Sequence, residues 1–471
     1  MLSNRLRRLS KTVRSANWLL PFFLCLVSIS LVSYGLVGAF ALPSVGMAMA
    51  TLLLLTIFTR DIPRLLLLPV MSTCLLLALL VLWVLFQAFD QSTPGNAAWS
   101  KLSSLNFSYS PHISIAPADT VYAIQALALP YLTFLTSMLI GRNESERRLL
   151  VRQLGWIGII VISLSFIQFL VSNDYILTRQ KQFYPDSFTS FFVNRNNAGT
   201  FIGLALLINL RQLWSVSRPF SAREIGEFVI SGHVVAGRRP IASVIYAALL
   251  FVLLIALFMT KSRGAIVASL ISASAFMSFL LWLRWRARGN ARPSWFRFAS
   301  CLLILLVVIV LVFALFGGRV AMRARILGAD DPRFCVMPGI LRLAVDSWPF
   351  GTGAGTFAYA FAPYRDPACG LSGIWQKAHN SYLQSIIELG APGTAILGLT
   401  LVIVAVVLVR MLITDQRQRS YAALALSALA LLAMHSLVDF SAEIPAVALY
   451  FSALIGSCIV LGASGASRPP S

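Results

Sequence analysis

Charged residues are scarce in this sequence. Only 12% of its 471 residues are Asp, Glu, Lys or Arg, whereas 58% are hydrophobic. A water-soluble domain with so few charges would expose more contiguous apolar surface than soluble proteins tolerate. The scarcity of charge therefore excludes a soluble globular protein and indicates a chain that folds in a lipid bilayer.

Acidic residues are scarcer still, with 17 Asp and Glu against 38 Lys and Arg and a formal net charge of +21. In a soluble protein this excess would suggest nucleic-acid binding. In a membrane protein, basic residues gather in cytoplasmic loops and set the orientation of the chain. We therefore expect membrane lipids, and no nucleic acid, among its partners.

Histidine and cysteine are also rare. The four histidines lack the spacing of metal ligands, so we expect no metal and no cofactor. Most cysteines lie in apolar runs and are expected to pack as small hydrophobic residues. Cys335 and Cys369 instead share one polar loop. A disulfide is allowed there if the loop faces an oxidising compartment, but the sequence does not fix the geometry, so both states stay open.

What the chain has in abundance is apolar runs of about 20 residues, the length that crosses a bilayer as a helix. They predict an all-α polytopic membrane protein with about twelve transmembrane helices in one domain over residues 1–471. The expected spans are two within 18–59, joined by a turn near 38–43, and then 65–87, 120–140, 151–171, 190–210, 241–259, 264–283, 299–316, 383–409, 421–438 and 445–462.

Alternate connections between these spans are rich in arginine, which predicts that both termini are cytoplasmic. The apolar run after the basic N-terminus is too long for a cleavable signal peptide. The largest connection on the opposite side is residues 317–379, and its aromatic residues predict a folded loop with short helices. Its glycine-rich stretch 348–356 has no Lys-Ser/Thr after it, so a nucleotide loop is rejected in favour of a flexible turn.

Two groups of cations interrupt the outer side. Arg195, beside Asn194, opens the span 190–210, where it can bind an anion at a helix N-terminus or only reach the lipid headgroups. Lys261 and Arg263 occupy a short turn and can clamp a phosphate or act as interfacial anchors. The same two alternatives apply to three arginines at the start of the large loop, Arg319, Arg323 and Arg325.

His379 ends the large outer loop just before an apolar span, with Asn380 beside it. Its ordinary pKa suits a general base near neutral pH, and its position reaches both water and lipid. Glu388 lies deeper in the same span, either as part of the site or as a buried hydrogen-bond partner. Asp439 and Glu443, between the last two spans, can be structural partners of the outer cations, and neither is assigned a catalytic role.

These segments resemble the O-antigen ligase and polysaccharide polymerase family of bacterial inner membranes. The resemblance rests on residues 192–196, 262–264, 349–353, 379–380 and 388–390 and extends over most of 190–410. It implies an integral-membrane glycosyltransferase architecture of the C type. The protein would be a multi-pass protein of the inner membrane with its active site on the periplasmic side, and 317–379 would be a large periplasmic loop.

The resemblance also implies chemistry. The donor would be a glycan on undecaprenyl diphosphate, Arg195, Arg263 and Lys261 would bind its diphosphate, and His379 would act on the acceptor hydroxyl. Arginines that neutralise the leaving diphosphate make a metal unnecessary, and a single displacement would invert the anomeric carbon. The leading hypothesis is a ligase acting on lipid A–core. The alternatives are a polymerase that extends a growing glycan and, less favoured, a transporter of lipid-linked sugar.

Overall fold

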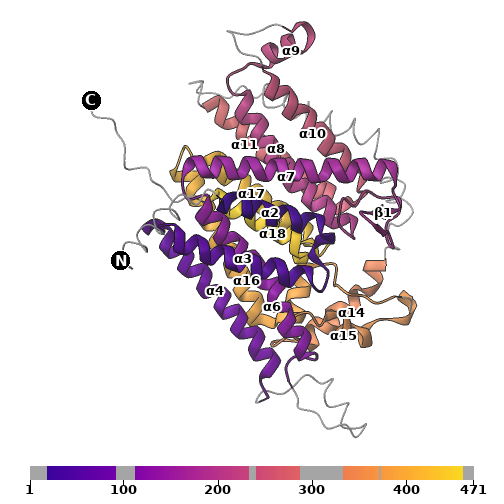
Figure 1. Cartoon of the computed structure of the whole chain (residues 1–471). Helices are drawn as coiled ribbons and strands as arrows, with labels where there is room; N and C mark the ends of the chain where they lie inside the picture. The colour runs from indigo at the N-terminus through magenta and orange to yellow at the C-terminus, as the bar shows by residue number, and fades with distance from the viewer. Residues whose placement is uncertain (1–17, 92–111, 233–239, 287–331, 371–372, 460–471) are drawn as a thin grey trace.

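The fold is predominantly helical. The computed structural model describes residues 18–91, 112–232, 240–286, 332–370 and 373–459. Within them the one sheet is a short antiparallel hairpin of β1 (Tyr175–Ile176) and β2 (Arg179–Gln180). Eight of the helices are long and apolar enough to cross a membrane, and three shorter ones are apolar. The prediction of an all-α polytopic membrane protein is confirmed (Figure 1).

The helices follow the expected order of spans. The predicted span 299–316 lies outside the described residues, and every other predicted span corresponds to a helix. These helices are α2 (Leu19–Val32), α3 (Ala41–Thr59), α4 (Arg64–Phe89), α6 (Pro117–Ile140), α7 (Glu144–Val171), α8 (Arg195–Ser217), α10 (Ile241–Met259), α11 (Arg263–Arg286), α16 (Ser381–Thr414), α17 (Arg419–His435) and α18 (Pro445–Cys458). A short amphipathic helix, α9 (Ala222–Ser231), lies between α8 and α10.

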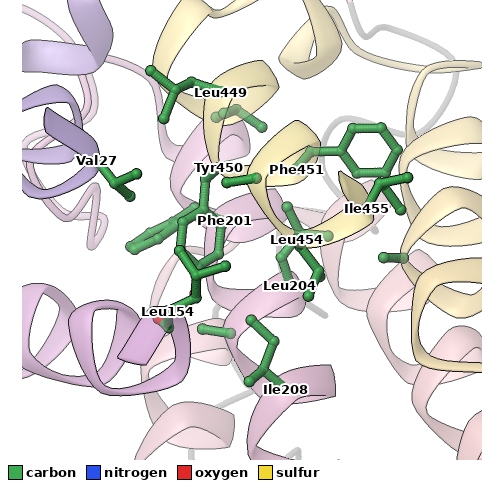
Figure 2. Close-up of a cluster of buried hydrophobic side chains, with 14 of the residues drawn as sticks. Val27, Leu154, Phe201, Leu204, Ile208, Leu449, Tyr450, Phe451, Leu454 and Ile455 are labelled. Carbon is green, nitrogen blue, oxygen red and sulfur yellow. The ribbon is translucent and has the colours of Figure 1, made fainter. Parts of the chain in front are cut away.

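Two helices form the centre of the bundle. Every residue of α18 is buried, and so is every residue of α8 from 196 to 212. Helix α18 packs on α6, whereas α8 packs against α7, α10, α11 and α17. Figure 2 shows the apolar side chains that α7, α8 and α18 contribute between them, with Phe201 against Tyr450. By contrast, few residues of α16 are buried, as expected of a helix that faces lipid.

Small residues bring α8 and α11 into close contact. A Cβ atom at Gly199 would lie 2.5 Å from the Cβ of Ala265, and one at Gly203 would collide with Ser269. Close approach through small residues is a common way for membrane helices to associate. Because both helices begin at the same end of this contact, it brings their first residues, Arg195 and Arg263, to one end of the bundle.

The described part of the large loop 317–379 is folded, as its apolar residues predicted. It contains α14 (Pro332–Asp346), α15 (Phe357–Phe361) and two 3-10 turns, Ala362–Tyr364 and Pro367–Cys369. Val336, Ile340 and Phe357 lie in its own small hydrophobic cluster. Cys335 and Cys369 form a disulfide, which resolves the alternative that the sequence left open. Figure 1 shows α14 and α15 (orange) together at one edge of the bundle.

The glycine-rich stretch 348–356 serves as a structural turn. Helix α16 breaks at Gly390, whose φ is 64°, and the stretch 348–356 fills the break. The amide of Thr352 donates to the carbonyl of Ile387 at 2.8 Å. The amide of Ala391 donates to the carbonyl of Pro349, also at 2.8 Å. A Cβ at Gly351 would lie 2.6 Å from the Glu388 carbonyl oxygen. The turn thus satisfies backbone groups that a broken membrane helix leaves unpaired.

Candidate functional site

Arg195 begins α8, as the sequence predicted. Asn194 caps the helix, since its side-chain oxygen accepts a hydrogen bond from the Asn196 amide at 2.8 Å. The Arg195 guanidinium lies over the Tyr184 ring, 4.8 Å from its centroid. Its Nε and Nη1 atoms are buried and have no hydrogen-bond partner among the described residues. Asn194 therefore orients the helix end, while Arg195 keeps donors that an anion can use.

Asp439 is the centre of the site. Its side chain is 0% exposed, and one carboxylate oxygen accepts a hydrogen bond from Asn196 Nδ2 at 2.7 Å. The other oxygen accepts from Ser441 Oγ at 2.5 Å. Asn196 Oδ1 in turn accepts from Ser262 Oγ at 2.7 Å. We call these four residues and His379 the polar node.

His379 completes the polar node. Its Nδ1 atom lies 3.9 Å from Asp439 Oδ1, which is the distance of an ion pair and longer than a hydrogen bond. The ring stands edge-on to Trp375 and Phe440, with centroids 5.5 and 5.0 Å away. The side chain is 18% exposed, so the imidazole is held on three sides but stays accessible.

Asn380 explains why His379 faces Asp439. It caps α16 by accepting from the amides of Tyr382 and Leu383 at 3.0 and 3.1 Å. Its Nδ2 atom donates to the carbonyl of Leu437 at 3.0 Å. These bonds tie the start of α16 to the segment that follows α17 and carries Asp439. Asn380 therefore positions the histidine.

The electrostatics of Asp439 favour an ionised carboxylate. Burial by itself would raise its pKa, but the facing His379, the nearby His435 and the hydrogen bond from Ser441 hold the pKa of Asp439 below its usual value. A carboxylate opposite Nδ1 stabilises the tautomer with a proton on that atom. The Nε2 atom then carries the lone pair that can accept a proton.

The two cations of the turn 260–264 have different environments. Lys261 is only 7% exposed, and its ammonium group donates to the backbone carbonyl of Asp186. It thus fastens the turn to the loop before α8. Arg263 is exposed and follows Ser262 of the polar node directly in the chain. Of the two, Arg263 is the better placed for a ligand, and Lys261 has a structural bond.

Glu388 contacts the large loop. Its Oε1 atom accepts from Gln384 Nε2 at 2.8 Å and from the Phe357 amide at 3.1 Å. These bonds hold the start of α15 against α16, the buried hydrogen-bonding role that the sequence left as one alternative. The other predicted supporting residues, Arg319 and Arg323, lie outside the described residues.

Sequence reasoning did not anticipate the position of Asp439. It expected a structural partner for the cations, but the structure places the carboxylate opposite His379. No local pattern signalled this contact, because Asn196 and His379 lie far from Asp439 in the sequence. Within the described part of the chain, no three His, Cys, Asp or Glu residues gather as metal ligands do.

Comparison with known families identifies this region. Residues 248–398 match the family described as O-antigen ligase. The match contains Arg263, His379 and Glu388, whereas Arg195 and Asp439 lie outside it. No curated protein matches the chain. The chain is thus a polytopic membrane protein whose residues 248–398 match the O-antigen ligase family, and this match supports a function of the polysaccharide ligase or polymerase type.

Proposed function

We propose that this protein transfers a glycan from undecaprenyl diphosphate to an acceptor sugar hydroxyl at the periplasmic face of the bacterial inner membrane. The ligase type, with lipid A–core as acceptor, is the leading form. One observation carries the proposal: His379 faces the buried carboxylate of Asp439 in a polar node. The node also contains the chain neighbours of Arg195 and Arg263, namely Asn196 and Ser262.

The polar node supports a single displacement. Asp439 holds the His379 ring, and Nε2 takes the proton of the acceptor hydroxyl as its oxygen attacks the anomeric carbon. The bond between that carbon and the diphosphate oxygen breaks, and undecaprenyl diphosphate leaves with the electron pair. Attack opposite the leaving group inverts the anomeric carbon. His379 ends the step protonated, and its imidazolium is stabilised by Asp439.

The leaving diphosphate is the second requirement. Charge grows on its oxygens as the glycosidic bond breaks, so preorganised donors at that place lower the barrier. Arg195 presents buried donors without a partner among the described residues, and Arg263 is the exposed first residue of α11. Guanidinium groups match phosphate oxygens in a two-pronged geometry. Two arginines thus supply positive charge without a metal ion being needed.

The acceptor decides between ligase and polymerase. Both activities would use the same donor and the same polar node. A strain that lacks a ligase accumulates long glycans on undecaprenyl diphosphate, whereas a strain that lacks a polymerase accumulates single repeat units. Analysis of the lipid-linked glycans in a deletion strain therefore separates the two activities. Transport would be favoured instead if glycan lengths were unchanged and lipid-linked sugar stayed on the cytoplasmic side.

His379→Ala tests the proposal directly. Loss of a general base costs about 100-fold or more in rate, so glycan transfer by the variant should fall at least that far. His112→Ala is the matched control, because His112 is outside the polar node, and it should keep normal activity. Immunoblotting of membranes checks that each variant accumulates, and His379→Gln provides a second variant. Full transfer by a well-inserted His379→Ala protein would overturn the mechanism.

A further inference from the structure

The opposite end of the same helices contains a large basic cavity. It has a volume of about 1670 Å³ and lies among the first turns of α7, α10 and α17 and the last turns of α8 and α11. Seven arginines and one glutamate are among its lining residues. Arg195 and Arg211 are both on α8, so the cavity lies about 24 Å along the helix from the polar node. It is a separate place from the candidate active site.

Two buried arginines share one aromatic ring at the wall of this cavity. The guanidinium carbons of Arg147 and Arg211 lie 4.0 and 3.4 Å from the centroid of Tyr421. Two groups so close to one centroid must occupy opposite faces of the ring. Arg211 and Tyr421 line the cavity, whereas Arg147 does not.

These two cations have too few partners within the described residues. Arg147 is 0% exposed, and none of its three guanidinium nitrogens has a hydrogen-bond partner there. Arg211 is 7% exposed, its Nε has no partner, and its one hydrogen bond goes to the neutral Ser420 Oγ at 3.4 Å. The one glutamate of the cavity, Glu144, pairs with Arg148. A buried charge without a counter-charge is strongly unfavourable.

Orientation of the chain does not account for this arrangement. The positive-inside bias needs arginines near the membrane surface, where their side chains reach water or headgroups. It gives no reason to bury two guanidinium groups on one ring. Cation–π contact with Tyr421 is attractive for each arginine, but it leaves both positive charges uncompensated. An anion in the cavity would compensate the charge of Arg211 directly.

We propose that this cavity binds the phosphate group of an anionic ligand. Arg211 is the buried contact, and the exposed Arg152 and Arg417 also line the cavity. Guanidinium groups match phosphate oxygens, and Trp156 and Trp214 supply apolar wall of the kind that lies at a membrane interface. Basic pockets between membrane helices bind phospholipid headgroups. The phosphate can come from an anionic phospholipid or from a soluble phosphate compound, and the experiment separates these sources.

The experiment measures thermal unfolding of the full-length purified protein in two arms. One arm compares nanodiscs of phosphatidylcholine with nanodiscs that also contain cardiolipin. The other adds inorganic pyrophosphate to detergent-solubilised protein and compares it with chloride at equal ionic strength. A ligand that binds only the folded state raises the unfolding temperature. We expect wild type to be stabilised in at least one arm, and the arm identifies the source of the phosphate.

Arg211→Gln should abolish that ligand-dependent increase, and Arg410→Gln should keep it. Arg410 is the matched control, because it is an exposed arginine of α16 that does not line the cavity. If Arg211→Gln fails to fold, the exposed Arg152→Gln and Arg417→Gln should each weaken binding roughly tenfold. A purely structural Arg211 would change the unfolding temperature equally with and without ligand. That result, or no stabilisation of wild type in either arm, would overturn the proposal.

Discussion

The two ends of α8 treat buried charge in opposite ways. At the start of the helix, Asn196 and Ser441 donate hydrogen bonds to the buried carboxylate of Asp439, and His379 faces it. At the other end, the chain buries Arg211 with no carboxylate bonded to it among the described residues. At the first end the buried carboxylate has its hydrogen-bond partners within the chain, while Arg195 keeps buried donors without a partner among the described residues. At the second end, no described residue supplies the counter-charge of Arg211, which in our proposal comes from an anionic ligand.

The difference follows from what each end does in our proposals. A catalytic base must be held in one orientation before the substrate arrives, so its partner belongs to the protein. A binding site gains affinity from charge that is uncompensated until the ligand is bound. Asp439 and Arg211 are therefore the two residues whose substitution separates the roles of the two ends most sharply.

The largest expected effect comes from Asp439→Asn. The amide preserves the shape and most hydrogen bonds of the side chain but removes the charge opposite His379. Glycan transfer should fall about 100-fold or more, with near-normal protein in the membrane. Glu443→Gln is the matched control, because Glu443 pairs with Lys377 at 2.8 Å outside the polar node. Equal losses of glycan transfer in both variants would contradict a specific role of Asp439.

Asp439→Asn should also change how thermal stability depends on pH. The folded state lowers the pKa of Asp439, so its stabilising contribution is fully present above the unfolded pKa of about 3.9. That contribution is lost as the pH falls through the lower folded value. The unfolding temperature of wild type should therefore fall more steeply in acid than that of Asp439→Asn. Parallel curves for the two proteins would show that the carboxylate is not stabilised on folding.

Removal of the disulfide is expected to have the next largest effect. Cys335→Ser with Cys369→Ser opens a covalent link between residues 34 positions apart, which should cost roughly 2–4 kcal/mol of local stability. Hydrogen exchange should rise in residues 332–370, and the arginine-rich end should be unchanged. Cys74→Ser, at an exposed free cysteine, serves as the control. Exchange that rises equally at both ends would contradict an effect confined to the polar-node end.

Arg195→Ala should have a smaller effect, which falls on donor binding. Loss of one charged hydrogen bond to phosphate should raise KM for the donor roughly tenfold. Arg195→Lys should recover part of the affinity, because an ammonium keeps the charge but loses the planar fork. Steady-state kinetics with a purified lipid-linked donor measures both. An unchanged KM in Arg195→Ala would place the diphosphate elsewhere.

Glu388→Gln should have the smallest effect. The glutamine side-chain oxygen can still accept the bond from the Phe357 amide, so stability should change by about 1 kcal/mol or less. Transfer activity should stay within a few-fold of wild type, in contrast to Asp439→Asn. Membrane extracts assayed side by side give the comparison. A well-inserted but inactive Glu388→Gln protein would mean that this carboxylate belongs to the reaction.

Local patterns in the sequence predicted much of the fold and part of the site. Apolar runs fixed the order of the described helices, and polar residues before them marked where α8 and α16 begin. The start of α8 was placed five residues early, because Asn194 caps the helix and the preceding residues form a turn. Lys261 was grouped with Arg263 because they are two positions apart, although only the folded turn shows that Lys261 is buried against the Asp186 carbonyl.

By itself, the sequence determined that this is a membrane protein and which segments are helices. It also determined that His379, Arg195 and Arg263 are at helix starts. Those properties depend on the transfer of short segments from water to lipid, which neighbouring residues decide. Only the tertiary structure decided that Asp439 meets Asn196, 243 positions away, and faces His379, and that Arg147 and Arg211 share the Tyr421 ring. Such contacts depend on how helices pack against one another, and no local pattern records that packing.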